Sequence, residues 1–205
     1  MTHRPAAVVF DLGNVLIDWD PAPAIAGAVG DAEAARFLAA EDFDFSAWNH
    51  EQDSGRPFEE SEVAAIERVP HWREHILAYR TYFDRSLIGE VPGAVALLRE
   101  LHAAGVRLFA LTNWSAELFP VALGRFDFLG LFEDIVVSGV ERLTKPDPRI
   151  FELLAARTGL PPADCVFVDD KAENIEAARA AGLDGVLFAG GELLRTQLRS
   201  RGLPV

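Results

Sequence analysis

Five short apolar runs, each followed by polar residues, constrain this chain more than any other feature of its sequence. They are rich in β-branched and aromatic side chains and span residues 6–11, 106–113, 134–138, 165–170 and 185–188. Runs that are apolar throughout are typical of parallel strands buried on both faces of a sheet. Helical patterns separate the later runs, at residues 92–104, 150–157 and 172–181. This alternation predicts an α/β fold with a doubly wound parallel sheet.

A stretch from about Trp19 to Ile88 interrupts the alternation. It contains no convincing strand, and it is rich in Ala, Glu and aromatic residues at helical spacing. We therefore expect a helical insert placed after the first strand. Turn-prone residues at 18–21 and 89–93 mark the expected hinges.

Composition excludes several classes of function. The 205 residues include 32 acidic and 19 basic side chains, so the net charge of −13 disfavours nucleic-acid or anionic-membrane partners. A single Cys excludes an intramolecular disulfide and any CxxC motif. No apolar run approaches a membrane span, and the first ten residues lack the apolar core of a signal peptide. We expect a cytoplasmic protein with a small-molecule partner, either a monomer or a homodimer.

Lysine is scarce in this chain, which uses arginine for nearly all of its basic residues. Of the 19 basic residues only Lys145 and Lys171 are lysines. Lysine is a compact point charge and arginine a planar fork, so the two are not interchangeable at a tight site. Each lysine is therefore either a residue that arginine cannot replace or a chance survivor.

Polar side chains follow the expected strands at the edge where ligands bind in open α/β sheets. They comprise three carboxylates, a hydroxyl with an adjacent amide, and an ammonium: Asp11, Asp169, Asp170, Thr112, Asn113 and Lys145. The carboxylates suit a hard cation such as Mg²⁺, which prefers oxygen ligands. The cation and the ammonium would attract a dianion such as phosphate, and a remaining carboxylate could attack it as a nucleophile.

Four short motifs carry a family resemblance. They are Val-Phe-Asp-Leu-Gly-Asn-Val-Leu at 9–16, Ala-Leu-Thr-Asn at 110–113, Lys-Pro-Asp-Pro at 145–148 and Phe-Val-Asp-Asp-Lys-Ala-Glu-Asn at 167–174. In this order the chain resembles, over essentially its whole length, the haloacid dehalogenase-like hydrolase superfamily, in the branch with an inserted α-helical cap. The resemblance implies a Rossmann-like catalytic core over residues 1–18 and 89–205, and a cap over 19–88. It also implies a Mg²⁺-dependent phosphatase that works through an aspartyl-phosphate.

The resemblance further implies a role for each motif residue. Asp11 would be the nucleophile and would also contact Mg²⁺. Thr112 would hydrogen-bond the phosphoryl oxygens during catalysis, with Asn113 supporting it at the substrate. Lys145 would bind the same group and neutralise the nucleophile and the developing charge. Asp170 would complete the metal shell.

Three more residues complete the implied site, and one of them departs from the family pattern. Asp169 and Asn174 would lie behind the metal ligands, with Asp169 acting through water or by orienting the site. Most phosphatases of the superfamily carry a second Asp two residues after the nucleophile, where this chain has Gly13. The Gly13 carbonyl would still bind the metal, but general acid–base catalysis, which contributes about 10²–10⁴ in rate, lacks its expected residue.

Candidate replacements for the missing acid are Asp18, His50 and Glu51. Each has an ordinary alternative role, such as a hinge contact or solvation. The Asp-Leu-Gly-Asn form of the first motif is similar to a bacterial subgroup that includes α-D-glucose-1-phosphate phosphatases. An anomeric leaving oxygen is less basic than an ordinary alcohol, so such a sugar phosphate would need less help from an acid.

The segment 43–56 mixes aromatic and polar side chains and suits a surface that closes over a small polar substrate. We expect Trp48 and His50 to contact that substrate. The alternative is a packing role within the insert, which we favour for at least two of Phe43, Phe45 and Trp48.

Two other functions remain open. A 2-haloacid dehalogenase would use Asp11 to displace halide without a metal and without the second Asp, although Asp169 and Asp170 would repel a halocarboxylate. A binding or regulatory module would keep the fold and lose turnover with the missing acid.

Overall fold

A five-stranded parallel sheet forms the core of the computed structural model, which describes residues 4–205. Residues 1–3, which the sequence assigns to the core, lie outside the described residues. The strand order is β5-β4-β1-β6-β7, and every neighbouring pair is parallel. The strands are β1 (Ala7–Phe10), β4 (Arg107–Thr112), β5 (Asp134–Val137), β6 (Cys165–Asp169) and β7 (Asp184–Leu187). The predicted α/β class with a doubly wound parallel sheet is therefore confirmed.

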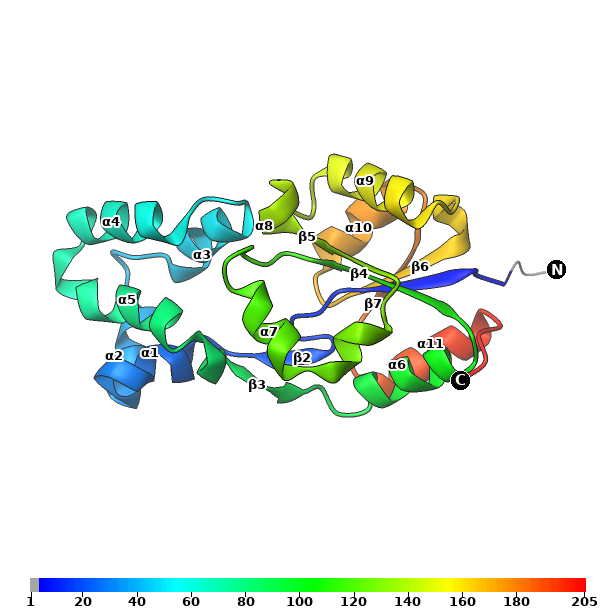
Figure 1. The fold of residues 1–205 in the computed structure, drawn as a ribbon, viewed down its shortest axis with the longest axis horizontal. Coiled ribbons are helices and arrows are strands. Elements are labelled where there is room, and N and C mark those ends of the chain that lie inside the picture. The colour runs from blue at the N-terminus through cyan, green and yellow to red at the C-terminus, as the bar shows by residue number, and fades with distance from the viewer. Residues whose placement is uncertain (1–3) are drawn as a thin grey trace.

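Both faces of the sheet are buried at its centre, which explains why β1 is apolar throughout and why β4 and β6 are apolar except at their ends. In β1, Val8 and Phe10 join one hydrophobic cluster, whereas Ala7 and Val9 join another on the opposite face. One face is covered by α9 (Pro148–Thr158) and α10 (Ala172–Ala180), and the other by α6 (Ala94–Ala103) and α11 (Gly191–Ser200) (Figure 1). Burial on both sides removes the polar alternation of a half-exposed strand.

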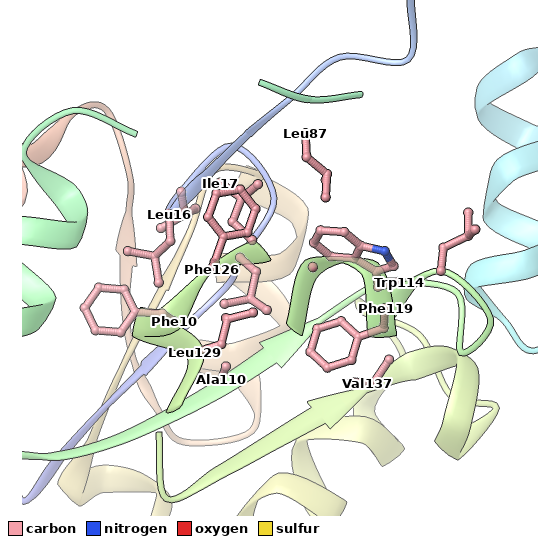
Figure 2. Close-up of a cluster of buried hydrophobic side chains, with 14 of the residues drawn as sticks. Phe10, Leu16, Ile17, Leu87, Ala110, Trp114, Phe119, Phe126, Leu129 and Val137 are labelled. Carbon is pink, nitrogen blue, oxygen red and sulfur yellow. The ribbon is translucent and has the colours of Figure 1, made fainter. Parts of the chain in front are cut away.

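The larger of the two hydrophobic clusters extends from the sheet to loops and helices beside it. Figure 2 shows Phe10 and Ala110 of the sheet facing Phe126 and Leu129, with Trp114 and Phe119 beside them. Phe119 begins α7 (Phe119–Arg125), and Val137 precedes the short helix α8 (Ser138–Glu141). Leu16 and Ile17 extend the same packing toward the strand pair described next (Figure 2).

A second, two-stranded sheet joins the two ends of the insert. Strands β2 (Ile17–Trp19) and β3 (Leu87–Glu90) pair antiparallel. The expectation of no strand between Trp19 and Ile88 is wrong at both margins, because β2 ends at Trp19 and β3 begins at Leu87. A bend at Pro21 and a turn at residues 92–93 lie within the expected hinges. Each strand has only three or four residues. Its partner lies about 70 positions away, so neither shows a local pattern.

Five helices lie between β2 and β3, as the helical spacing predicts. They are α1 (Ala22–Val29), α2 (Asp31–Leu38), α3 (Phe45–Asp53), α4 (Phe58–Arg68) and α5 (Arg73–Thr81). Aromatic rings hold them together, with Trp48 against Phe45, Phe58 and Tyr79 at centroid distances of 5.8–6.1 Å. We call residues 22–86 the helical region. It extends from one end of the sheet (Figure 1).

Short 3-10 segments connect several of these elements, at Pro70–Trp72, Phe83–Ser86, Asp127–Leu131 and Pro162–Asp164. Within residues 4–205, no helix is both long enough and apolar enough to cross a membrane. Cys165, at the start of β6, is a buried free thiol, and burial raises its pKa to about 11.

Candidate active site

The carboxyl ends of three adjacent strands place the first functional side chains together. Asp11 follows β1 directly, Thr112 is the last residue of β4, and Asp169 is the last residue of β6. The chain runs from β1 outward through β4 to β5 and then returns to β6 on the other side of β1. Such a reversal opens a crevice at the strand ends, where open α/β sheets bind ligands.

Lys145 lies at the centre of this crevice and uses all three of its donors. Its Nζ is 2.9 Å from Asp11 Oδ1 and 2.7 Å from Asp169 Oδ2. It also donates to the Leu111 carbonyl at 2.9 Å. Lys145 is 2% exposed, so these partners replace water almost completely. A buried ammonium with two carboxylate partners keeps its charge, and the pKa of Lys145 accordingly lies above its ordinary value although burial opposes this.

Two neighbours fix the position of Lys145. The Asn113 side chain accepts the Lys145 backbone N–H at 2.8 Å and donates to its carbonyl at 2.9 Å. Asp169 is fully buried and is held in turn by the Lys171 backbone N–H at 2.8 Å and by Asn174 Nδ2 at 3.0 Å. The Asp169 carboxylate is thus engaged by donors on both oxygens.

The acidic side chains form a cluster of oxygen donors. Carboxylate oxygens of Asp11, Asp169 and Asp170 lie within 4.8 Å of one another. Burial is the main cause that raises the pKa of Asp11 to about 7; Lys145 opposes the rise, and Asp169 adds to it. Burial and then Asp169 also raise the pKa of Asp170. A bound cation would stabilise the charged form of carboxylates whose pKa is raised in this way.

The donor chemistry fits a magnesium ion. Every group in the cluster offers oxygen, the ligand that Mg²⁺ prefers. Asn174 also reaches the site, and its buried Oδ1 has no hydrogen-bond partner among the described residues. An unpaired buried acceptor costs free energy unless a donor or a hydrated cation meets it.

A pocket of about 180 Å³ opens above these groups. Most residues predicted from the sequence line it: Asp11, Gly13, His50, Thr112, Asn113, Lys145, Asp170 and Asn174. Asp169 lies beneath the pocket floor, behind Lys145. The opposite wall comes from the helical region, including Ser46, Asn49 and Tyr79.

Trp48 does not line the pocket, and the expectation that it contacts substrate needs correction. The Trp48 side chain is 4% exposed and packs among Phe45, Phe58 and Tyr79. Phe43 and Phe45 are buried in the same cluster. The cause is the helical period, because residue 48 faces the interior of the helical region when residues 46, 49 and 50 face the pocket.

Among the pocket residues that the sequence-based prediction of the site did not include are two charged ones, Asp53 and Lys171. Asp53 is the last residue of α3, a helix that begins after Asp44, whose side chain accepts the Ala47 N–H at 2.9 Å. Along α3 the polar residues Ser46, Asn49, His50 and Asp53 line the pocket. Their spacing of three and four residues marks one face of a helix, and this stripe could have identified Asp53.

Comparisons with known proteins agree with this architecture. Residues 5–182 match the family described as haloacid dehalogenase-like hydrolase. A phosphoglycolate phosphatase of Cereibacter sphaeroides is 31% identical over 191 residues, which are 90% of this chain and 85% of that protein. The drimenol cyclase drtB of Aspergillus calidoustus is 28% identical over 195 residues, 94% of this chain and 35% of the cyclase. The chain spans less than half the length of the first curated relatives that it matches.

A solved structure has the same fold. It is a HAD family enzyme of Bacteroides thetaiotaomicron in a magnesium complex, with a TM-score of 0.72 and 20% sequence identity. The similarity covers 94% of this chain and all of that one. The family match extends over most of the described residues and includes all four motifs of the site. The chain therefore belongs to the haloacid dehalogenase-like hydrolase family.

Proposed function

We propose that this protein is a Mg²⁺-dependent phosphatase of a small phosphorylated metabolite, and that a sugar phosphate is its substrate. The observation that carries the proposal is the contact between Asp11 and Lys145 at 2.9 Å. It lies at the floor of a pocket, beside the carboxylates of Asp169 and Asp170. A nucleophile, a fixed cation and a metal-binding cluster at one sheet edge suit attack on a phosphate dianion.

Asp11 is oriented for nucleophilic attack. Its Oδ1 accepts the Leu12 backbone N–H at 2.7 Å and lies 2.9 Å from Lys145 Nζ. These contacts hold the carboxylate against the pocket before substrate arrives, which lowers the entropic cost of reaching the reactive geometry. We infer that Asp11 attacks phosphorus and forms an aspartyl-phosphate, while the Thr112 hydroxyl and Lys145 hold the phosphoryl oxygens.

The metal would be held by Asp11, Asp170 and the Gly13 carbonyl. The Asp169 oxygens are already occupied by Lys145, Asn174 and the Lys171 N–H, which favours an orienting role for Asp169. When bound, Mg²⁺ supplies positive charge to the phosphoryl group as it is transferred. Asn174 would support the site through its hold on Asp169.

We infer that residues 19–88 act as a cap over a core formed by residues 1–18 and 89–205. The wall that the helical region contributes to the pocket is polar, with Ser46, Asn49 and His50. Hydroxyl, amide and imidazole groups suit the hydroxyls of a sugar. One relative is a phosphoglycolate phosphatase and one structural neighbour forms a magnesium complex, which supports the assignment.

Dehalogenation is the second candidate function, and Gly13 is the observation that favours it. A dehalogenase needs no acid at that position, because halide leaves without a proton. The cluster of Asp11, Asp169 and Asp170 speaks for the phosphatase, because these carboxylates would repel a halocarboxylate in the absence of a cation.

One assay separates the two functions and the regulatory alternative. The purified protein is incubated with a panel of hexose phosphates, hexitol phosphates and 2-phosphoglycolate, with Mg²⁺ or with EDTA, and phosphate release is measured. Chloride release from 2-chloropropionate is measured in parallel. We expect phosphate release that EDTA and Asp11→Asn each abolish. Chloride release that survives EDTA would support the dehalogenase, and silence in both arms with intact Mg²⁺ binding would favour a module without turnover.

A further inference from the structure

Gly13 leaves the proposed phosphatase without its usual proton donor, although nothing in the packing requires a glycine there. A Cβ built at Gly13 would meet no atom within 4 Å, and the backbone is not in the left-handed region. The site therefore has room for a side chain that the sequence does not supply. A reaction that expels an alkoxide still needs a proton, so another group at the pocket must provide it.

We propose that Asp53, on the last turn of α3, is the general acid and base of this enzyme, acting from the helical region in place of a residue at position 13. The inference rests on the proposed phosphatase function. Asp53 and Asp11 line the same pocket, one from the helical region and the other from the sheet. A substrate between them would present its phosphorus to Asp11 and its leaving oxygen to the opposite wall.

The structure holds Asp53 firmly in this place. Its Oδ2 accepts a hydrogen bond from Asn49 Nδ2 at 3.1 Å, and the carboxyl also accepts the Ser115 backbone N–H. The Asp53 carbonyl accepts a bond from Ser138 Oγ at 2.5 Å. Ser115 and Ser138 belong to the core, so the end of α3 is tied to the sheet side of the pocket. An acid must lie within about 3 Å of the oxygen that it protonates, and such fixed partners favour that precision.

The surroundings of Asp53 suit a group that gives and takes a proton near neutral pH. Burial is the main cause that raises its pKa to about 7; Lys171 opposes the rise, and Asp11 adds to it. Its place at the carboxyl end of a helix acts in the same direction, because the helix dipole disfavours negative charge there. The charge of Lys171 limits the rise of the Asp53 pKa, which gives Lys171 a role at the site.

The other candidate acids are less well placed. Asp18 is exposed on β2 and does not line the pocket. Glu51 is paired with Arg56 at 2.5 Å on the outer side of α3. His50 lines the pocket but is exposed, whereas Asp53 lies deeper on the same helix face. Asp53 is thus the carboxyl of the helical region that combines pocket access with fixed partners.

The proposed steps balance as follows. In the first step an Asp11 oxygen bonds to phosphorus, the bond from phosphorus to the leaving oxygen breaks, and protonated Asp53 gives its proton to that oxygen. The alcohol departs and Asp53 is left as a carboxylate. In the second step Asp53 takes a proton from water as the water oxygen attacks phosphorus. The bond to Asp11 then breaks, and inorganic phosphate, free Asp11 and protonated Asp53 result.

The test compares two leaving groups in Asp53→Asn and in a control, Asp18→Asn. The probes are p-nitrophenyl phosphate, whose nitrophenolate leaves without a proton, and the alkyl phosphate from the panel that the wild type hydrolyses fastest. For Asp53→Asn we expect kcat/KM to fall by about 10²–10⁴ with the alkyl phosphate and by less than about tenfold with p-nitrophenyl phosphate. A burst of about one nitrophenolate per enzyme should precede slow turnover, because the second step also lacks its base. Asp18→Asn should match the wild type with both probes.

Each other outcome overturns the inference. An equal loss of kcat/KM with the two probes would mean that Asp53 only ties α3 to the core. A selective loss in His50→Gln with none in Asp53→Asn would transfer the role to His50. If the wild type releases no phosphate, or if Asp11→Asn keeps activity, the phosphatase function itself fails. Circular dichroism verifies folding, and Asp53→Ser gives the same comparison where the Asn variant does not fold.

Discussion

At the scale of single residues, Lys145 shows what lysine offers in a chain that otherwise uses arginine. Its ammonium lies between Asp11 and Asp169, and the residue is only 2% exposed. A guanidinium is larger and planar, so it could not place one charge between two carboxylates in this volume. Lys171, the second lysine, lies at the same pocket, so neither lysine is a surface residue remote from the site.

We predict that Lys145→Met lowers the free energy of unfolding by about 3–5 kcal/mol at pH 7.5, because two buried carboxylates lose their cation. Urea unfolding followed by circular dichroism measures the change. The loss should be smaller at pH 5.5, where Asp11, whose pKa is already raised to about 7, is protonated. Lys171→Met, on an exposed side chain, is the matched control and should cost less than about 1 kcal/mol. Equal losses in the two variants would contradict this interpretation.

A pH-dependent stability should follow from Asp53. Its pKa of about 7 in the folded protein exceeds the value of about 3.9 in an unfolded chain. The folded state therefore binds more protons between these values, and the stability that Asp53 contributes at pH 4 is lost as pH rises through 7. Asn cannot ionise, so Asp53→Asn should gain on the order of 1–4 kcal/mol relative to the wild type between pH 5 and 8. Urea unfolding in EDTA buffer tests this, and parallel pH profiles for the two proteins would refute it.

At the scale of elements, α3 divides its residues between two tasks. Phe45 and Trp48 belong to the aromatic interior of the helical region, while Asn49 and Asp53 face the pocket. The helical spacing of segment 43–56 already contained this division. Which of the two faces meets the pocket depends on packing between helices that are distant in sequence, and this is why segment 43–56 alone predicts Trp48 rather than Asp53 at the substrate.

The strands of the core were predictable because burial on both faces leaves a strong local signal. β1 is apolar along its whole length and Asp11 follows it directly, and β6 is apolar up to its last residue, Asp169. β2 and β3 are short, and their pairing depends on a contact between distant segments, so no local sequence pattern predicts them. The convergence of Asp11, Thr112 and Asp169 could be inferred, since parallel neighbours end at one edge. Their distances and their order around Lys145 required the three-dimensional fold.

We predict that Glu117→Ala loosens the helical region where α4 begins. Glu117 lies in the core loop after β4, and its Oε1 accepts the Phe58 N–H at 2.8 Å. Pro57 at the N-cap offers no side-chain bond, so Glu117 supplies the cap from outside the helix. Its loss should cost about 1 kcal/mol and speed hydrogen exchange in the first turn of α4, measured by mass spectrometry. Glu67→Ala, at the far end of α4, is the control, and equal exchange in the two variants would exclude the proposed capping.

At the scale of the whole molecule, the net charge of −13 means that acids far outnumber bases, yet the site concentrates both lysines beside three acids. We predict that Mg²⁺ raises the free energy of unfolding at pH 8 by about 2.7 kcal/mol when present at 100 times its dissociation constant. Thermal unfolding across a Mg²⁺ titration measures this. Asp170→Asn should abolish most of the gain, whereas Asp18→Asn should keep it. An unchanged gain in Asp170→Asn would remove Asp170 from the metal site.

The bond from Ser138 Oγ to the Asp53 carbonyl spans the boundary between the helical region and the core. With the proposed nucleophile on one side of this boundary and the proposed proton donor on the other, neither unit would carry a whole reaction centre. Recombination between relatives that exchanges only the inserted helices would then transplant half of the chemistry along with the substrate preference. Hybrids of this protein should be active only when both parents place the proton donor in the same unit. We therefore expect the two units to evolve together.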